Sequence, residues 1–379
     1  MSDLHTATLR LSPDIQNKRK TNEQNERAKK HAKQTSTFQS TDQINESLSV
    51  TSSSKQIPSL FTILHANWQP YDRMADIVRL ESGEKVDQWT IVGKLGEGGF
   101  GSVYKVSRGN EIYALKTESL KEKVKLLKME VYVLKLANER KSKHFCICED
   151  TGIYKKCLYL VMTLLGPCLQ DVRKELPGQK FSMGCALSVG IQCLEAIEEL
   201  HAIGFLHRDI KPSNYATGRG KLDELRRIYI LDFGMCRSYL DEHGRFRPPR
   251  KVAGFRGTVR YASLSCHIRR ETCRKDDIES WLYQQIEVTR GALPWRSLDD
   301  KKDEVAMFKE RCRFEVGLQE LMGGCPREYV EILRYIDSLR FYDNPNYEKI
   351  YKLMRKAMSE LQVQEFPYDW EQSLNQPIR

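Results

Sequence analysis

The sequence has no hydrophobic run of the length that a membrane span requires. Its longest apolar stretches, such as residues 158–165, fall far short of the ~20 residues that a membrane-spanning helix needs. The first residues also lack the apolar core of a secretory signal peptide. We therefore expect no membrane association and no secretion, and we expect a cytoplasmic protein.

The sequence also lacks any C-x-x-C pair, although it contains 11 cysteines, an odd number. Neither a zinc ribbon nor a disulfide framework is therefore indicated. The nearest approach to a metal-binding cluster is His144, Cys146 and Cys148. Buried or half-buried free thiols in a reducing compartment are the preferred interpretation of these cysteines.

The N-terminal segment has few hydrophobic residues, and Ser, Thr, Asn and Gln dominate it. Residues 1–55 carry nine basic and six acidic residues. Such a segment cannot bury enough surface to offset its chain entropy, so we predict a disordered basic tail over 1–60 and an extension over 61–86. Its basic clusters at 18–20 and 29–30 resemble a two-part nuclear localisation signal. A merely solvated tail is the favoured alternative, and a nuclear location stays open.

The formal net charge of the chain is +10, and most of it lies in one segment. Residues 235–270 hold nine basic residues against two acidic ones. Charge concentrated in one segment indicates an anionic partner there. A nucleic-acid binding module is the alternative, but no zinc finger, basic zipper or RNA-binding motif accompanies the charge, so we expect no nucleic-acid partner.

A glycine-rich turn lies between two predicted strands, 89–95 and 102–106. It reads Gly96-Glu-Gly98-Gly-Phe-Gly101-Ser-Val103, a G-x-G-x-x-G-x-V pattern. A dinucleotide-binding turn leads into a helix, whereas this one leads into a second β-rich run. Strand, glycine turn and strand are typical of the hairpin that covers the phosphates in protein kinases.

The next predicted strand, 112–116, ends in Lys116, which supplies a charge suited to the phosphates of a nucleotide. Glu130 follows on a predicted amphipathic helix and can pair with Lys116. The apolar face of that helix is predicted to consist of Val124, Leu127, Val131 and Leu134. A buried strand over 158–162 then leads to a hinge at 163–167, and Met162 either borders an adenine pocket or is an ordinary core residue.

A predicted core helix over 183–202 leads to the loop His207-Arg-Asp209-Ile-Lys211-Pro-Ser-Asn214, which fits the H-R-D-x-x-x-x-N pattern. In this pattern Asp209 accepts the proton of an incoming hydroxyl, and Lys211 neutralises the transferring phosphoryl oxygens. Asn214 supplies an oxygen ligand for Mg²⁺. Asp232 of the following Asp232-Phe-Gly234 is a hard oxygen donor for the same ion.

Taken together, these motifs resemble a eukaryotic protein kinase from about residue 89 to residue 370. The resemblance implies an α+β, bilobal kinase domain over 87–372. Its small antiparallel β-rich N-lobe would span 87–162, its hinge 163–167, and its larger, mainly α-helical C-lobe 168–372. It also implies binding of ATP and Mg²⁺, with nucleotide contacts from Leu95, Gly96, Gly98, Gly101, Val103, Ala114, Lys116, Met162 and Leu165.

Features of the C-lobe narrow the resemblance. The A-P-E motif of most protein kinases is absent, and residues 257–267 resemble the casein kinase 1 group instead. Residues 247–257 and 366–371 resemble its tau-tubulin kinase branch, whereas the hinge looks more like casein kinase 1 proper. By this resemblance Asp277 anchors the catalytic loop, and Arg256 and Arg260 bind an anion near the substrate.

The sequence thus predicts a serine/threonine protein kinase that transfers the γ-phosphoryl of MgATP, with a preference for acidic or pre-phosphorylated protein substrates. The alternative is a kinase-shaped scaffold without activity. It is disfavoured because Lys116, Glu130, Asp209, Asn214 and Asp232 are all present. A cytoskeletal substrate stays open. Ser238, Tyr239 and Thr258 are available for phosphorylation, although the resemblance implies constitutive activity.

Overall fold

A computed structural model describes residues 78–98, 101–298 and 301–371. The tail predicted over 1–60, with its basic clusters, and most of the predicted extension lie outside these residues.

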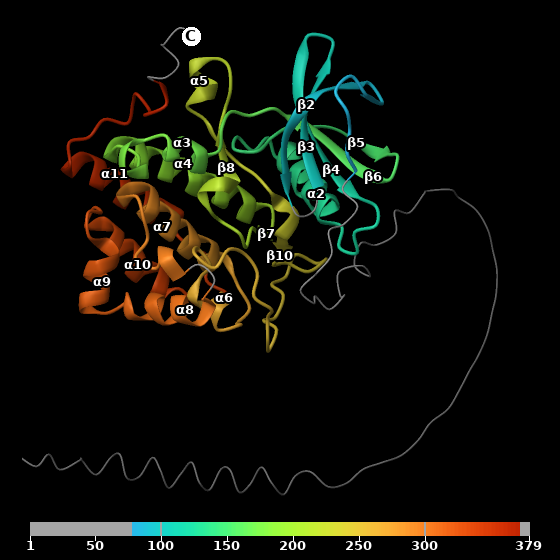
Figure 1. The fold of residues 1–379 in the computed structure, drawn as a ribbon. Coiled ribbons are helices and arrows are strands. Elements are labelled where there is room, and N and C mark those ends of the chain that lie inside the picture. Colours follow the sequence, from blue (N-terminus) through green and yellow to red (C-terminus); the bar gives the residue numbers. More distant parts are fainter. Residues whose placement is uncertain (1–77, 99–100, 299–300, 372–379) are drawn as a thin grey trace, which may run out of the picture. The chain divides into compact units, whose positions relative to one another are not determined.

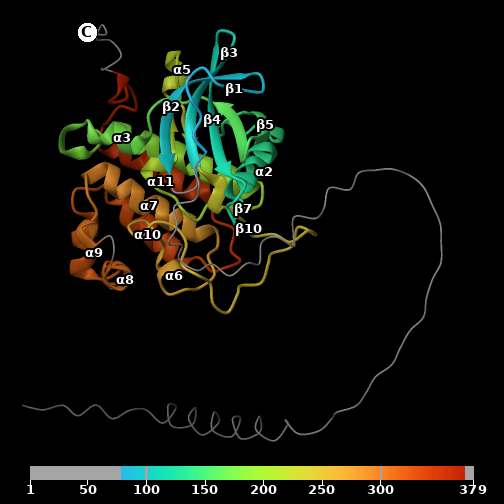
Figure 2. The same cartoon turned by 45° about the vertical axis from the view of Figure 1, so that its right-hand side comes forward.

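The first part of the described chain is a six-stranded antiparallel sheet with the strand order β1-β2-β3-β4-β6-β5 (Figure 1). Its strands are β1 (Lys85–Val86), β2 (Trp89–Gly98), β3 (Gly101–Arg108), β4 (Glu111–Ser119), β5 (Cys148–Tyr154) and β6 (Cys157–Thr163). Helix α2 (Leu126–Glu139) packs against β4, β5 and β6, and Figure 2 shows it beside the sheet. Because β1 pairs with β2, the sheet begins inside the segment 61–86 that the sequence predicts as an extension.

Alternation of buried and half-exposed side chains is regular along β3. Along β3, Ser102, Tyr104 and Val106 are buried, and the residues between them are half-exposed. Tyr104 and Val106 belong to a cluster that also contains Trp89 and Leu80, on the face away from α2. Period-two burial of this kind is what a two-sided sheet requires.

The apolar face predicted for α2 was partly wrong. Leu127 and Leu134 are buried as predicted, but Val124 precedes the helix and Val131 is only half-buried. Val133 takes the core position instead, on the same helical face as Glu130. A spacing of three residues, from 130 to 133, keeps both side chains on one face of an α-helix. Glu130 therefore points inward.

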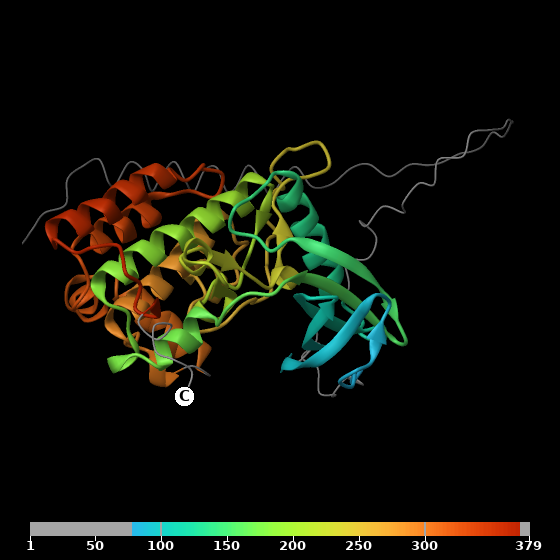
Figure 3. The ribbon, with the colours of Figure 1, turned by 90° about the horizontal axis from the view of Figure 1, so that it is seen from above.

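The second part of the described chain is mainly helical. Its longer helices are α4 (Met183–Ala202), α7 (Arg274–Arg290), α8 (Lys302–Arg311), α9 (Glu315–Met322), α10 (Glu328–Ser338) and α11 (Tyr347–Glu360). Helix α4 has the predicted bounds, and in Figure 3 it lies beside α11. Helix α7 is buried along almost its whole length between α4 and α10. The predicted α+β class, with an antiparallel sheet and a larger helical lobe, is confirmed.

Short elements at the end of α4 that faces the sheet carry the motifs singled out in the sequence. They are β7 (Phe205–Leu206), the 3₁₀ turn η3 (Pro212–Asn214), β8 (Tyr215–Thr217), β9 (Ile228–Ile230), the 3₁₀ turn η4 (Phe233–Met235) and β10 (Arg237–Ser238). The remaining helices are α3 (Leu169–Lys174), α5 (Leu222–Leu225) and α6 (Leu264–His267). Among the described residues, no helix combines the length and apolarity of a membrane span.

Candidate active site

A buried carboxylate on α7 holds the loop between β7 and η3. Asp277 accepts hydrogen bonds from the backbone N–H groups of His207 and Arg208, at 2.7 and 2.9 Å. His201 Nε2 lies 2.9 Å from the same side chain. Arg208 has a left-handed backbone with φ of 69°, which costs free energy in a residue other than glycine. The two hydrogen bonds therefore hold a strained turn in place.

The Asp277→Asn substitution is expected to destabilise this turn. The side-chain amide keeps one acceptor oxygen and turns an N–H group toward a backbone N–H. We expect a loss of about 1–3 kcal/mol in unfolding free energy, the cost of an unsatisfied buried group, together with lower activity. Urea unfolding measures this loss, and Asp303→Asn on the exposed start of α8 is the matched control. Equal stability of the two variants would contradict the anchoring role.

The same carboxylate gives a pH dependence. Burial by itself raises the pKa of Asp277, but hydrogen bonds from His201 and Arg208 outweigh burial and hold the pKa below its usual value. Its stabilising effect is therefore present above the unfolded pKa of about 3.9 and is lost as the pH falls through the folded pKa. We expect the Asp277→Asn variant to lose this part of the acid dependence.

Asp209 lies at the centre of a compact polar cluster. Its Oδ2 accepts a hydrogen bond from Lys211 Nζ at 2.7 Å, and its Oδ1 accepts one from the hydroxyl of Thr258 at 2.8 Å. Lys211 Nζ also lies 3.2 Å from Thr258 Oγ1, and the amide of Asn214 donates to the Asp209 carbonyl at 2.8 Å. Thr258 is 49 residues away from Asp209 in the sequence. The sequence indicated Thr258 only as a residue available for phosphorylation, so its contact with Asp209 was not predicted.

Lys116 lies between two carboxylates from different parts of the chain. Its Nζ is 2.6 Å from Glu130 Oε2 on α2 and 3.3 Å from Asp232 Oδ1, just before η4. The pairing of Lys116 with Glu130 that the sequence predicted is therefore present. Asp232, like Arg208, has a left-handed backbone, with φ of 65°.

The three groups shift one another's pKa values. Burial by itself lowers the pKa of Lys116, but Glu130 and Asp232 outweigh it and raise the pKa. Burial raises the pKa of Glu130 despite the nearby ammonium. Burial also acts to raise the pKa of Asp232, but Lys116 outweighs it and lowers that pKa. Lys116 is therefore charged, and Asp232 is ionised, as a metal ligand must be.

The glycine-rich turn joins β2 and β3, with Gly96 opposite Val103 and Gly98 opposite Gly101. A Cβ atom on Gly101 would lie 1.7 Å from the carbonyl oxygen of Thr117, so no other residue fits there. Cβ atoms on Gly96 and Gly98 would meet no atom within 4 Å. The two glycines leave open space, which suits close approach of a ligand to the backbone.

The other predicted nucleotide contacts are partly brought together. Ala114 on β4 lies opposite Met162 on β6, and both are buried in one cluster. Val103 and Leu165 pack against that cluster from the side. Leu95 belongs to neither cluster and is about half exposed.

Asn214 and Asp232 fit the binding of a divalent cation. The pairing of β8 with β9 and the hydrogen bond from Leu231 N–H to the Asn214 carbonyl, at 2.8 Å, bring their segments side by side. A carboxylate and an amide supply the oxygen donors that Mg²⁺ prefers. His144, Cys146 and Cys148 fit metal binding less well. Burial raises the pKa of the Cys146 thiol to about 12, which disfavours the thiolate that a metal needs, and His144 Nδ1 lies 2.7 Å from the Ile228 carbonyl oxygen.

The two arginines predicted to bind an anion occupy different surroundings. Arg256 lines a pocket beside the catalytic loop with Arg208, Arg250 and Arg270. Arg260 instead lies 3.3 Å from the fully buried Glu287 on α7.

Part of the positive charge of the segment 235–270 is neutralised by acidic residues within and beyond it. Glu271 forms ion pairs with both Arg250 and Arg237, and Arg245 pairs with Asp241. Since Glu271 lies one residue outside the segment, the sequence count overstated the net charge of this region. Arg250, Arg256 and Arg270 of the segment line one pocket together with Arg208, Asp276 and Asp277.

The comparison with known proteins agrees with this geometry. The model of the protein kinase domain family matches residues 89–334. A probable serine/threonine-protein kinase of Dictyostelium discoideum is 35% identical over 76% of this chain and 57% of its own length. The serine/threonine-protein kinase spe-6 of Caenorhabditis elegans is 35% identical over 75% of this chain and 76% of its own length. The chain therefore belongs to the protein kinase family and is a protein serine/threonine kinase.

Proposed function

We propose that the cluster around Asp209 transfers the γ-phosphoryl of MgATP to serine and threonine hydroxyls of protein substrates. The observation that carries this proposal is the position of Asp209 between Lys211 and Thr258, at 2.7 and 2.8 Å. A carboxylate held on both sides presents a fixed acceptor to an incoming hydroxyl, which is what general-base catalysis requires.

Each residue has a defined task in this proposal. Asp209 orients the acceptor hydroxyl and takes its proton, and Lys211 stabilises the negative charge that develops on the transferring group. Lys116, oriented by Glu130, binds phosphate oxygens of the nucleotide. Asn214 and Asp232 would hold Mg²⁺, which neutralises phosphate charge when bound. The test is a radiolabelled-ATP assay of the full chain on serine and threonine peptides, with tyrosine peptides as the comparison.

We further propose that the pocket lined by Arg208, Arg250, Arg256 and Arg270 favours acidic or pre-phosphorylated substrates, because these four arginines outnumber the two carboxylates in its lining, Asp276 and Asp277. Burial, and then the charges of Arg237, Arg256 and Arg250, lower the pKa of Arg208 to about 10. A bound anion would relieve this repulsion. Arg256, which lines the pocket, is two residues before Thr258. Since Thr258 contacts Asp209, the pocket lies near the residue that accepts the proton of the substrate hydroxyl.

Arg260 remains a second candidate for this anion. Arg173 Nη2 lies 3.3 Å from Glu287 Oε1, and the hydroxyl of Tyr261 also bonds to Glu287. Arg260 can therefore turn toward a substrate without leaving Glu287 unpaired.

Replacement of these arginines should change substrate preference. A hydrogen bond to a charged group contributes roughly 1.5–3 kcal/mol, so we expect Arg256→Ala to lower kcat/KM for acidic or phosphorylated peptides by about tenfold or more. Arg260→Ala should act in the same direction, and the double replacement more strongly. Steady-state kinetics on primed and unprimed versions of one peptide measures this effect, with Arg334→Ala on the exposed face of α10 as the control. Equal losses on neutral peptides would show that the two arginines are structural.

The finer affiliation is also a proposal. The segment 257–267 that stands in place of A-P-E supports the casein kinase 1 group, and residues 247–257 and 366–371 support its tau-tubulin kinase branch. Cytoskeletal substrates are a proposal from that affiliation, and a cytoplasmic location, with a nuclear one as the alternative, is a proposal from the N-terminal sequence. Phosphorylation of purified tubulin by the full chain, compared with casein, tests the substrate class.

A further inference from the structure

Helix α8 carries a fully buried lysine near its C-terminal end. Lys309 is 0% exposed, which is rare for this residue type because removing an ammonium group from water is costly. Its Nζ donates hydrogen bonds to the carbonyl oxygens of Val259 and Ala262, at 2.9 and 2.6 Å. It also lies 3.2 Å from His267 Nε2. These contacts place a buried positive charge directly beneath the segment 259–262.

Two aromatic rings complete the environment of this ammonium group. Lys309 Nζ lies 4.8 Å from the ring centre of Tyr283 and 5.2 Å from that of Trp295, within the range of cation–π attraction. His267 must accept its hydrogen bond as an unprotonated nitrogen. Burial, followed by the charge of Lys309, lowers the pKa of His267 to about 4, so the ring is neutral at physiological pH.

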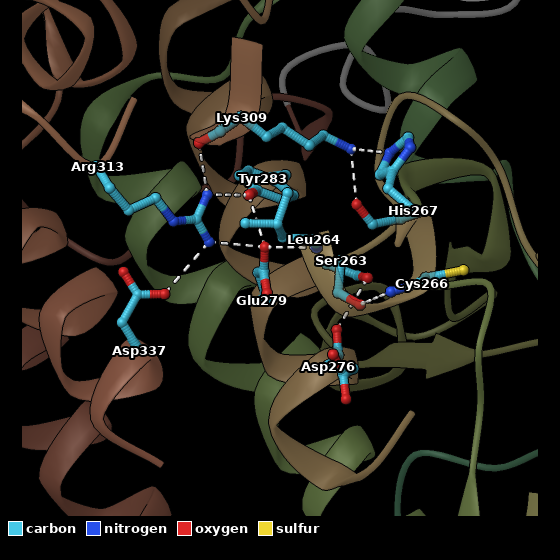
Figure 4. A network of polar contacts seen from close by, with 12 residues as sticks. Ser263, Leu264, Cys266, His267, Asp276, Glu279, Tyr283, Lys309, Arg313 and Asp337 are labelled. Atoms are coloured by element: carbon cyan, nitrogen blue, oxygen red, sulfur yellow. Dashed lines mark hydrogen bonds and ion pairs between the residues drawn. The ribbon is translucent and has the colours of Figure 1, made fainter. Parts of the chain in front are cut away.

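A second layer of contacts fixes the surroundings of Lys309. The hydroxyl of Tyr283 lies 2.7 Å from Glu279 and 2.7 Å from Arg313, and Arg313 forms an ion pair with Glu279 at 2.8 Å. Arg313 also donates to the backbone carbonyl of Lys309 at 2.9 Å. Figure 4 shows Arg313 pointing toward Tyr283 and Glu279, and the side chain of Lys309 extending toward His267. The ammonium position is therefore set by a rigid network.

The segment that Lys309 holds is continuous with the catalytic cluster. Val259 directly follows Thr258, whose hydroxyl lies 2.8 Å from Asp209. The indole N–H of Trp295 donates to the intervening carbonyl of Arg260 at 2.9 Å. Carbonyls of three of the four residues 259–262 are thus bound from below. A hydroxyl that reaches Asp209 therefore lies next to Thr258, the residue that directly precedes this backbone.

We propose that Lys309 is a positioning residue for the peptide substrate, acting through the backbone of residues 259–262. This proposal rests on the proposed function of Asp209. In the native protein the ammonium group fixes the directions of two carbonyl groups, and its removal leaves both without this hydrogen bond. The segment next to Thr258 then samples more conformations, and peptide binding becomes weaker. The nucleotide contacts at Lys116 and Asp232 lie in other segments and are not affected.

The Lys309→Met substitution tests this proposal, since Met fills a similar volume without a charge. We expect KM for the best serine peptide of a synthetic library to rise at least tenfold, while KM for MgATP changes by less than twofold. Lys352→Met, on α11 where Lys352 is 74% exposed, should leave both values unchanged. An unchanged peptide KM would overturn the proposal. An equal rise of both KM values together with a fall in thermal stability would also overturn it.

A pair of substitutions at His267 provides an independent measurement if Lys309→Met does not fold. His267→Gln keeps an acceptor for Lys309, whereas His267→Leu removes it. We expect His267→Leu to raise the peptide KM at least threefold and His267→Gln to stay near the wild-type value. Equal behaviour of the two variants would contradict a role of the ammonium contacts.

Discussion

Asp209→Asn is expected to lower kcat for peptide phosphorylation by at least about 100-fold, the lower end of what a general base contributes. The substitution changes few atoms, so the backbone contacts of the loop to Asp277 remain. It removes the proton acceptor and turns an amide N–H group toward Lys211 Nζ, which lies 2.7 Å from the native carboxylate. Radiolabelled-phosphate transfer to a serine peptide measures the loss.

The control separates chemistry from folding. Asp223→Asn, on the exposed helix α5, makes the same chemical change away from the site. The affinity of the Asp209→Asn variant for MgATP, measured by the thermal shift that the nucleotide causes, should stay within twofold of the wild-type value. An Asp209→Asn enzyme as active as the wild type would refute the assignment of the site.

Lys116→Met should also remove nearly all transfer activity, because it deletes the charge that is oriented by Glu130 and lies next to Asp232. The structure adds a consequence for stability. Glu130 has a side chain only 3% exposed, and breaking a buried ion pair typically costs roughly 3–5 kcal/mol. Lys116 is 27% exposed, so the cost should fall at the lower end of this range. Urea unfolding and the same phosphate-transfer assay measure the two effects.

A second substitution separates the effect of Lys116→Met on stability from its effect on activity. In Lys116→Met/Glu130→Gln the buried charge is gone, so we expect most of the lost stability to return while activity stays absent. Lys135→Met, on the exposed face of α2, is the matched lysine control. Stability that does not recover in the double variant would mean that Glu130 is not the residue left unpaired.

The pH dependence of Lys116→Met follows from the sign of the shift. The pKa of Glu130 is already raised by burial, and loss of Lys116 raises it further. A raised folded pKa stabilises the protein at low pH, and this stabilisation is lost as the pH rises through that value. We therefore expect the stability deficit of Lys116→Met to be smaller at pH 5 than at pH 8. The Lys116→Met/Glu130→Gln double variant should show no such trend.

Sequence reasoning succeeded for contacts that short patterns encode and failed for those that depend on packing. The bounds of α4 were predicted from helical spacing, and the pairing of Lys116 with Glu130 was predicted from the accompanying kinase motifs. The error at Val131 arose because several registers of an amphipathic pattern fit one short helix, and only contact with the sheet selects among them. The contact between Thr258 and Asp209 had no local signal.

The prediction of an anion-binding surface from the charge count also depended on packing. The sequence located a basic segment, but a count cannot show which arginine meets which carboxylate. Folding brings Glu271 to Arg250 and places Arg260 beside Glu287 on α7. Folding also brings Arg250 and Arg256 into one pocket with Arg208 and Arg270, which lie apart in the sequence.

The sequence by itself contained the kinase motifs, and their resemblance to a protein kinase predicted the fold class and the candidate reacting groups, because such motifs depend on residue types at short, fixed spacings. Only the tertiary structure decided how the segment after Thr258 is supported. Lys309 lies 50 residues from Val259, and its burial and direction depend on how α8 packs beneath that segment. A lysine in a helix is ordinarily exposed, so no sequence pattern distinguishes one whose ammonium group binds backbone carbonyls.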